Sequence, residues 1–314
     1  MKNDKSVFKF NPSECVPFRD RKVIDKVLKI KREDIEKHPN PDFKISVVPD
    51  ADFEFTMITD MFSRIKHSAE TGEKLVMILP NPCPTYRLVA RLINACNISC
   101  KNVYAFAMDE YADENGNIAP AEWEFGFTYA MMKYFYYEID KKLRPPISQI
   151  ISFTNKNINI YGKMIEDSGD ADICYSGPGW TGHLAFIEPD APEFQAPLEE
   201  WKNMSARICT LSPFTIAQNS LHGYFGKSGN LAAVPPKAAT IGPREVIRSK
   251  HRIDHHGITV HGTTTAWQRF ITRLVLHGPV TPLVPESILQ TLRTDVYVSE
   301  TIAQNIEPDW NKGY

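Results

Sequence analysis

The sequence predicts an α/β fold: a doubly wound, mostly parallel sheet with helices on both faces, in a Rossmann-like three-layer arrangement. Short, continuous apolar runs alternate along the chain with longer segments that have a helical period. Such alternation is typical of parallel strands that are covered by helices on both faces. The chain has 314 residues, of which 42% are hydrophobic, enough to bury a sizeable core.

The elements follow in order from this pattern. A helical period begins at Asp52, places Ile58, Met61 and Ile65 on one face, and stops at Gly72, a residue suited to a helix end. Apolar runs predict strands over 74–79, 102–108, 149–153, 171–176, 257–261 and 295–299. Further helical periods predict helices over 85–96, 123–139, 155–167 and 263–276.

The first 50 residues do not show this alternation. They contain the charged run 29–34 and the proline-rich run 38–41, which together predict a helical and extended segment that leads into the core. We find no internal repeat, low-complexity tract or linker in the rest of the chain. We therefore expect an N-terminal extension over 1–50 and a single α/β domain over 51–314.

Charge and composition favour a cytoplasmic protein with a small-molecule partner. The formal net charge is -2, so no global field favours nucleic acid or an anionic membrane. No segment approaches the roughly 18 apolar residues of a membrane span, and the N-terminus lacks the apolar stretch of a secretion signal. The six cysteines lack zinc-site spacings, and the adjacent His255 and His256 would point to opposite faces of a strand, so we expect no metal site.

The most informative segment, GPGWTGHLAFIEP over 177–189, places a histidine and a carboxylate in a glycine-rich turn after the predicted strand 171–176. His183 therefore emerges beyond the carboxyl end of a strand, where open α/β sheets bind their ligands. An imidazole can move protons near neutral pH, and Glu188 can orient it. The alternative for Glu188 is a helix-start residue beside Pro189.

A second segment, FAMDEY over 106–111, places Asp109 at the end of the predicted strand 102–108. A carboxylate there can take a proton from the carbon beside a sugar carbonyl, and partial burial would raise its basicity. The alternative is an Asp that caps the following turn. Two acid–base groups at one sheet edge together favour catalysis.

These two segments resemble the glucosamine-6-phosphate deaminase (isomerase) family, whose motifs read Gly-x-Gly-x-Asp-Gly-His-Ile-Ala-Phe-Asn-Glu-Pro and Asn-Met-Asp-Glu-Tyr. Both occur here in the family's order, and the similarity extends thinly from Lys74 to Arg273. The resemblance implies that Asp109 is the base that moves a proton on the sugar, and that His183 and Glu188 are the catalytic pair. It also implies loss of the 2-amino group as ammonia, without a metal or organic cofactor.

The departures from the family fall on the substrate site. Thr181 stands where the family has Asp, and a hydroxyl cannot hold an imidazolium by charge. The family's phosphate loop, Thr-Gly-Gly-Thr-Pro, corresponds to NPCPT over 81–85, whose prolines lack the N–H that binds an anion. Leu221 and Thr265 take the places of the phosphate-binding Arg and Lys, which removes contacts of roughly 1.5 to 3 kcal/mol each.

Other residues could still contact the substrate. Of the remaining cations Arg87, Arg207, Lys237 and Arg244, Arg207 best matches a family position. Trp180 would either stack on a sugar ring or close its loop. The predicted substrate-binding residues are Asn81, Pro82, Cys83, Thr85, Glu110, Gly179, Trp180, Thr181, Gly182, Arg207 and Thr265.

We therefore expect a sugar isomerase that also acts as a deaminase, on a modified or non-phosphorylated sugar such as an amino sugar or a sugar acid. One alternative is a lactone hydrolase similar to 6-phosphogluconolactonase, although the MDEY run at 108–111 belongs to the deaminase pattern. The other alternative is a catalytically weak sugar-binding protein. The oligomeric state stays open, a homo-oligomer included.

Overall fold

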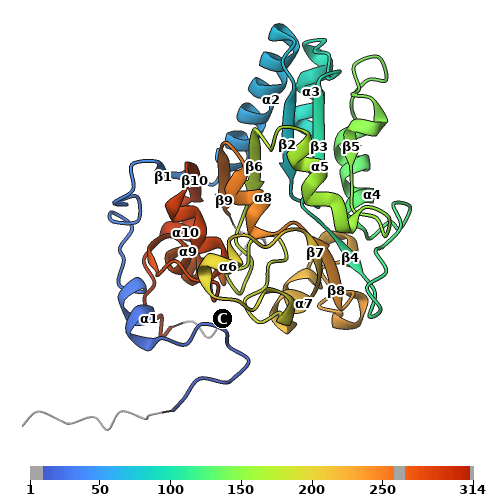
Figure 1. The fold of residues 1–314 in the computed structure, drawn as a ribbon. Coiled ribbons are helices and arrows are strands. Elements are labelled where there is room, and N and C mark those ends of the chain that lie inside the picture. Colours follow the sequence, from blue (N-terminus) through green and yellow to red (C-terminus); the bar gives the residue numbers. More distant parts are fainter. Residues whose placement is uncertain (1–9, 258–265, 312–314) are drawn as a thin grey trace, which may run out of the picture.

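The computed structural model describes residues 10–257 and 266–311. In this part of the chain the main sheet has seven strands in the order β1-β10-β9-β6-β2-β3-β5, and each neighbouring pair is parallel (Figure 1). The strands are β1 (Phe43–Val48), β2 (Leu75–Leu79), β3 (Val103–Ala107), β5 (Ile150–Ile151), β6 (Ile173–Ser176), β9 (Arg252–His256) and β10 (Thr294–Ser299). The doubly wound parallel sheet that the sequence predicts is confirmed.

Both faces of this sheet are buried, as the continuous apolar strands require. In β2, Val76 and Ile78 pack into one hydrophobic cluster, whereas Met77 and Leu79 pack into another on the opposite face. Helices α2 (Phe53–Thr71) and α3 (Tyr86–Ala95) belong to the second cluster. The first cluster takes residues from α1 (Arg21–Val27), α5 (Tyr161–Asp167), α6 (Leu198–Trp201), α8 (Pro243–Arg248), α9 (Gln268–His277) and α10 (Glu300–Ala303).

A second, smaller sheet is absent from the sequence prediction. Its antiparallel strands lie in the order β4 (Asp109–Ala112), β8 (Lys237–Thr240), β7 (Arg207–Thr210), and Figure 1 shows them below the main sheet together with α7 (Pro213–Asn219). Each strand has four residues, several of them polar, so no apolar run marks them. The chain passes from β3 through Met108 into β4, so Asp109 begins this sheet at the carboxyl edge of the main one.

Two predicted elements differ from the structure. The sequence predicts a helix over 123–139, but α4 covers only Phe127–Met131 and continues as the π-helix η1 (Met132–Tyr136). Of the predicted strand 257–261, residues 258–261 lie outside the described residues; the strand observed just before this range, β9, ends at His256. The sequence prediction placed a strand on the apolar residues after Gly257. It missed β9 because four of its five residues are polar, so that β9 is not an apolar run.

The N-terminal part of the chain contributes to the main sheet. Strand β1 pairs in parallel with β10 along its whole length, from Phe43 opposite Thr294 to Val48 opposite Ser299. The boundary expected at residue 50 therefore does not coincide with the edge of the sheet, which begins at Phe43. Of the helices that the structure describes, none has the length and apolar character to cross a bilayer.

The strand order creates a switch point between β2 and β6. From β2 the chain adds β3 and β5 on one side, then returns to add β6, β9 and β10 on the other. In doubly wound sheets, ligands bind outside the carboxyl ends of the strands at such a point. The residues that follow β2 and β6 are therefore the first place to look for a site.

Candidate active site

His183 and Glu188 form a buried pair in the loop after β6. The imidazole Nδ1 lies 3.2 Å from Glu188 Oε2, and the two residues are 5% and 1% exposed. Two hydroxyls complete the cluster: Thr215 Oγ1 lies 2.9 Å and Thr181 Oγ1 lies 3.1 Å from the same Nδ1. Thr181 also donates to Glu188 Oε2 at 3.1 Å. The imidazole is thus held through one nitrogen, which leaves Nε2 for chemistry.

Glu188 is held in its ionised form. Burial would raise its pKa, but the charge of His183 and hydrogen bonds from His183, Thr215 and Thr181 together lower the pKa below its ordinary value. Its other oxygen, Oε1, accepts from the backbone N–H of Ser212 at 3.4 Å. An ionised carboxylate at Nδ1 favours a proton on that nitrogen, so Nε2 can act as a base.

Gly179 makes room for this imidazole. A Cβ built on Gly179 would overlap the His183 ring, closest to Nε2. The glycine therefore allows the ring to lie against the loop backbone. Gly182 has a positive φ of 75°, which favours glycine at the turn just before His183. Gly179 and Gly182 of the predicted motif thus both help to position the histidine.

Asp109 is the second candidate acid–base group. It is 6% exposed, and no described residue gives a hydrogen bond to its buried Oδ1. Burial, reinforced by the charge of Glu110, raises the pKa of Asp109 well above its ordinary value. A carboxylate with a raised pKa and an unpartnered oxygen at a strand end has the properties of a general base.

Glu110 does not have the substrate-binding position that the sequence predicts. Its fully buried carboxylate accepts hydrogen bonds from the backbone N–H groups of Tyr111 (2.8 Å), Phe127 (2.9 Å) and Thr128 (2.6 Å). It thereby satisfies N–H groups at the start of α4 that the helix leaves unpaired. Its role in the structure is to attach α4 to β4.

Sequence comparison relates the chain to one group of enzymes. It is 30% identical to a glucosamine-6-phosphate deaminase of Caenorhabditis elegans over 195 residues, which cover 60% of this chain and 66% of the relative. It is 26% identical to a glucosamine-6-phosphate deaminase of Porphyromonas gingivalis over 269 residues, covering 83% and 92% of the two chains. No protein-family profile matches the sequence.

Solved structures share the fold. A monomeric glucosamine-6-phosphate deaminase superposes with a TM-score of 0.67 at 20% identity and covers 83% of this chain and 98% of its own. The chain is thus similar in sequence to glucosamine-6-phosphate deaminases, and it shares the fold of one of them. A 6-phosphogluconolactonase from Trypanosoma cruzi has a TM-score of 0.58 at 15% identity, with 87% of this chain and 99% of that chain covered, so the lactonase shares the same architecture.

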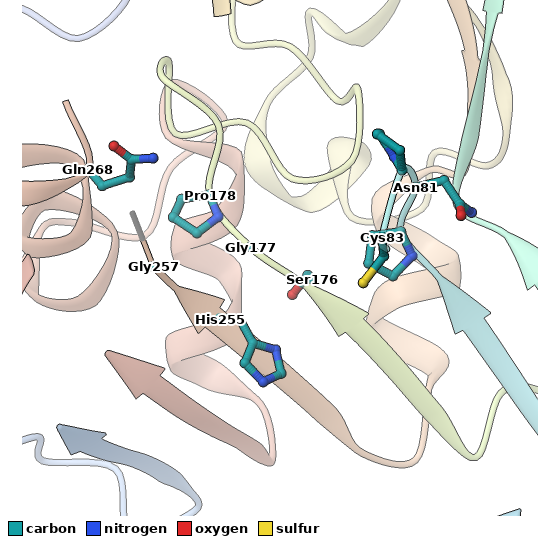
Figure 2. A pocket seen from close by; sticks show the side chains of 10 residues that line it. Asn81, Cys83, Ser176, Gly177, Pro178, His255, Gly257 and Gln268 are labelled. Carbon is teal, nitrogen blue, oxygen red and sulfur yellow. The ribbon is translucent and has the colours of Figure 1, made fainter. Parts of the chain in front are cut away.

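A cavity lies at the switch point of this deaminase-type fold. It has a volume of about 250 Å³ and lies between the loop after β2, the loop after β6 and the end of β9 (Figure 2). Three predicted substrate-binding residues, Asn81, Pro82 and Cys83, line it together with Pro80, Ser176, Gly177, Pro178, His255, Gly257 and Gln268. Neither Asp109 nor His183 lines it, although Gly177 and Pro178 lead directly into the His183 loop.

The structure does not bring the predicted cations to this cavity. Arg207 donates to the carbonyl oxygens of Ser205 (3.0 Å) and Glu193 (2.7 Å), and its guanidinium lies 5.1 Å from the centroid of the Phe194 ring. These contacts give it a structural role in place of the predicted substrate contact. Two other candidates are also paired with acids: Arg87 lies 3.4 Å from Glu138, and Arg244 lies 3.2 Å from Glu245.

The remaining predicted residues have mixed positions. Trp180 is 38% exposed and stacks on Trp267 with ring centroids 6.0 Å apart and an interplanar angle of 12°, so it connects its loop to the start of α9. Thr85 precedes α3 as its N-cap residue and does not line the cavity. Thr265 lies outside the described residues.

Sequence reasoning missed a buried polar cluster beneath the loop. His256 Nε2 lies 2.8 Å from Asp254 Oδ2, and Ser176 Oγ donates to Asp254 Oδ1 at 2.8 Å. Glu286 is fully buried, and its backbone N–H donates to Gly182 O at 3.0 Å. The only hint in the sequence is the Asp254-His255-His256 run, whose histidines we expected to point to opposite faces of a strand.

Proposed function

We propose that this protein isomerises an aldose to a ketose with loss of ammonia, acting on a modified or non-phosphorylated sugar. Asp109 would be the base that moves the proton between C1 and C2, and His183, oriented by Glu188, would open the sugar ring. The main support for this proposal is the buried cluster at His183 Nδ1, in which Glu188 and two threonine hydroxyls contact one ring nitrogen.

The chemistry follows from these groups. His183 Nε2 would take the proton of the anomeric hydroxyl and deliver a proton to the ring oxygen, so that the free aldehyde forms. Asp109 would then remove the proton at C2 and return a proton at C1, which converts the 2-amino aldehyde through an enolamine to an imine at C2. Its raised pKa makes it a stronger base than an ordinary carboxylate, and its unpartnered Oδ1 leaves an oxygen for the substrate. Water would then add to C2 of this imine, and the amino group would leave as ammonia, so that the 2-keto sugar forms.

Two features support a substrate without the usual phosphate. The residues that replace the family's Arg and Lys, Leu221 and Thr265, carry no charge. Arg207, the best remaining candidate, has its guanidinium engaged by two carbonyl oxygens and an aromatic ring. A phosphate would therefore lack the charge-assisted contacts that bind it tightly.

Proton exchange in deuterium oxide tests the reaction itself. We expect the enzyme to incorporate deuterium at C2 of its amino sugar and to release ammonia, and we expect Asp109→Asn to lose both. Glucosamine, N-acetylglucosamine and glucosamine 6-phosphate form the first panel. Ligand binding that raises the melting temperature with neither exchange nor ammonia would instead favour the sugar-binding alternative.

A further inference from the structure

We propose that the switch-point cavity binds a group of the ligand that donates hydrogen bonds and carries no negative charge, such as sugar hydroxyls or an amine. The inference rests on the proposed function in one respect, namely that the occupant is part of a sugar. It goes further because it assigns a chemical character to the subsite and excludes both a phosphate and a sugar acid from it.

The first observation concerns charge. None of the described residues that line the cavity is Lys, Arg, Asp or Glu. Burial lowers the pKa of His255 to about 4, so this side chain is neutral at physiological pH. An anion in the cavity would therefore have no fully charged partner to replace its hydration.

The second observation concerns hydrogen-bond donors. Pro80, Pro82 and Pro178 line the cavity, and proline has no backbone N–H. Ser176 Oγ gives its single proton to Asp254, so it faces a ligand as an acceptor. Burial raises the pKa of the Cys83 thiol to about 11, which keeps that group neutral. The three prolines and the Ser176 hydroxyl therefore offer an anion no hydrogen-bond donor.

The third observation is a pair of unsatisfied acceptors. Asn81 Nδ2 donates to Leu79 O at 3.3 Å, and no described residue donates to its buried Oδ1. Thr56 Oγ1 gives its proton to Phe53 O at 2.7 Å, so it must accept from His255 Nε2 at 3.0 Å. The neutral imidazole then has a bare Nδ1, which also lacks a donor in the described chain. Two buried acceptors without donors cost free energy that a donating ligand would recover.

The Asp254 carboxylate, which lies behind Ser176 in the cavity wall, also favours a ligand that donates hydrogen bonds. Burial opposes ionisation of Asp254, but the charge of His256 and hydrogen bonds from His256, Glu286 and Ser176 lower the pKa of Asp254 below its ordinary value. Its carboxylate lies 2.8 Å from the oxygen of Ser176, which lines the cavity. His256 offsets the charge of this carboxylate, but its oxygen still takes the Ser176 proton and leaves that hydroxyl as an acceptor toward the cavity.

Calorimetric titration of the wild-type protein with glucosamine, glucose, gluconate and glucosamine 6-phosphate tests the inference without requiring turnover. We expect glucosamine and glucose to bind at least about tenfold more tightly than gluconate and glucosamine 6-phosphate. A preference for glucosamine over glucose identifies the amine as the donor, and equal affinity identifies the hydroxyls. Tighter binding of glucosamine 6-phosphate than of glucosamine, or no binding of any of the four, overturns the proposal.

Two variants add an internal check. Asn81→Asp places a carboxylate on the wall and should strengthen glucosamine binding and weaken glucosamine 6-phosphate binding, whereas Asn97→Asp, on an exposed turn, should change neither. A melting curve establishes that each variant is folded. The ammonia assay tests the proposed function separately. If the four ligands bind in the expected order but no ammonia is released, the proposed function is overturned and this inference stands. Ammonia release from tightly bound glucosamine 6-phosphate overturns this inference and the proposed non-phosphorylated substrate, and it leaves the proposed isomerase and deaminase reaction intact.

Discussion

Thr215 Oγ1 lies closer to His183 Nδ1, at 2.9 Å, than Thr181 Oγ1 does, at 3.1 Å. Thr181 occupies the motif position at which the family has Asp, whereas Thr215 comes from α7, 32 residues after His183. The two hydroxyls and Glu188 together surround one nitrogen. Where the family has an Asp at the motif position, this chain thus has the neutral hydroxyls of Thr181 and Thr215, and Glu188 is the one carboxylate that contacts the nitrogen.

Thr215→Val tests this arrangement because it removes the hydroxyl and keeps the shape. Loss of one neutral hydrogen bond should cost about 1 kcal/mol, so we expect the turnover rate to fall about fivefold. Thr215→Ser retains the hydroxyl and should restore the rate, which a purely packing role would not predict. The pH profile of turnover should also change in Thr215→Val, since the hydroxyl contacts the titrating pair. An unchanged rate and profile would mean that Thr215 does not position His183.

Gly179→Ala should displace the imidazole, since a Cβ at this position would overlap the ring. A shift of a catalytic group by about 1 Å can cost about 100-fold in rate, and we expect a loss of that order. Gly223→Ala is the matched control, because a Cβ there meets no atom within 4 Å. The measurement is turnover together with the melting temperature. Full activity in Gly179→Ala would show that the ring does not need its observed position.

Asp109→Asn separates catalysis from stability. We expect deuterium exchange at C2 to fall by about 10²- to 10⁴-fold, the usual contribution of a general base. We also expect the variant to be more stable at neutral pH, by on the order of 1 kcal/mol, because the raised pKa means that the fold disfavours the ionised form. Asp25→Asn, on the exposed surface of α1, should change neither quantity. Exchange at the wild-type rate in Asp109→Asn would remove this residue from the mechanism.

Glu286→Gln tests the buried cluster beneath the loop. Burial, together with the charge of Asp254, raises the pKa of Glu286 well above its ordinary value of 4.5. The folded protein therefore holds this proton more tightly than the unfolded chain, so wild-type stability falls as the pH rises above about 4.5 toward the raised pKa. The amide cannot ionise, so the variant should melt at a higher temperature than wild type at pH 7.

That difference should disappear at acidic pH, where Glu286 is protonated in both states of the wild type. Glu33→Gln, at an exposed position, serves as the control and should track the wild type throughout. Melting temperatures measured across this pH range provide the comparison. Equal stabilities of wild type and Glu286→Gln at pH 7 would contradict the assigned protonation state.

The sequence predicted most elements of the main sheet because the patterns that mark them lie within the elements themselves. Strand β2 and helix α2 are recognisable from a run of apolar residues and from a period that ends at Gly72, whatever the rest of the chain does. The small sheet of β4, β7 and β8 was missed because its four-residue strands are partly polar and because β4 pairs with a strand, β8, that lies more than 100 residues further along the chain. The helix over 123–139 was overextended because its start depends on capping by Glu110, which comes from another element.

The sequence by itself determined the doubly wound architecture and the presence of an Asp, a His and a Glu at strand ends, because periodicity and motif spacing are properties of neighbouring residues. Only the tertiary structure decided how those groups are partnered. It brought Thr215 to His183, assigned Glu110 to helix capping and engaged Arg207 with backbone carbonyls. It also surrounded the switch-point cavity with uncharged residues. Hydrogen bonding and burial depend on groups that are distant in the chain, so no local pattern could reveal them.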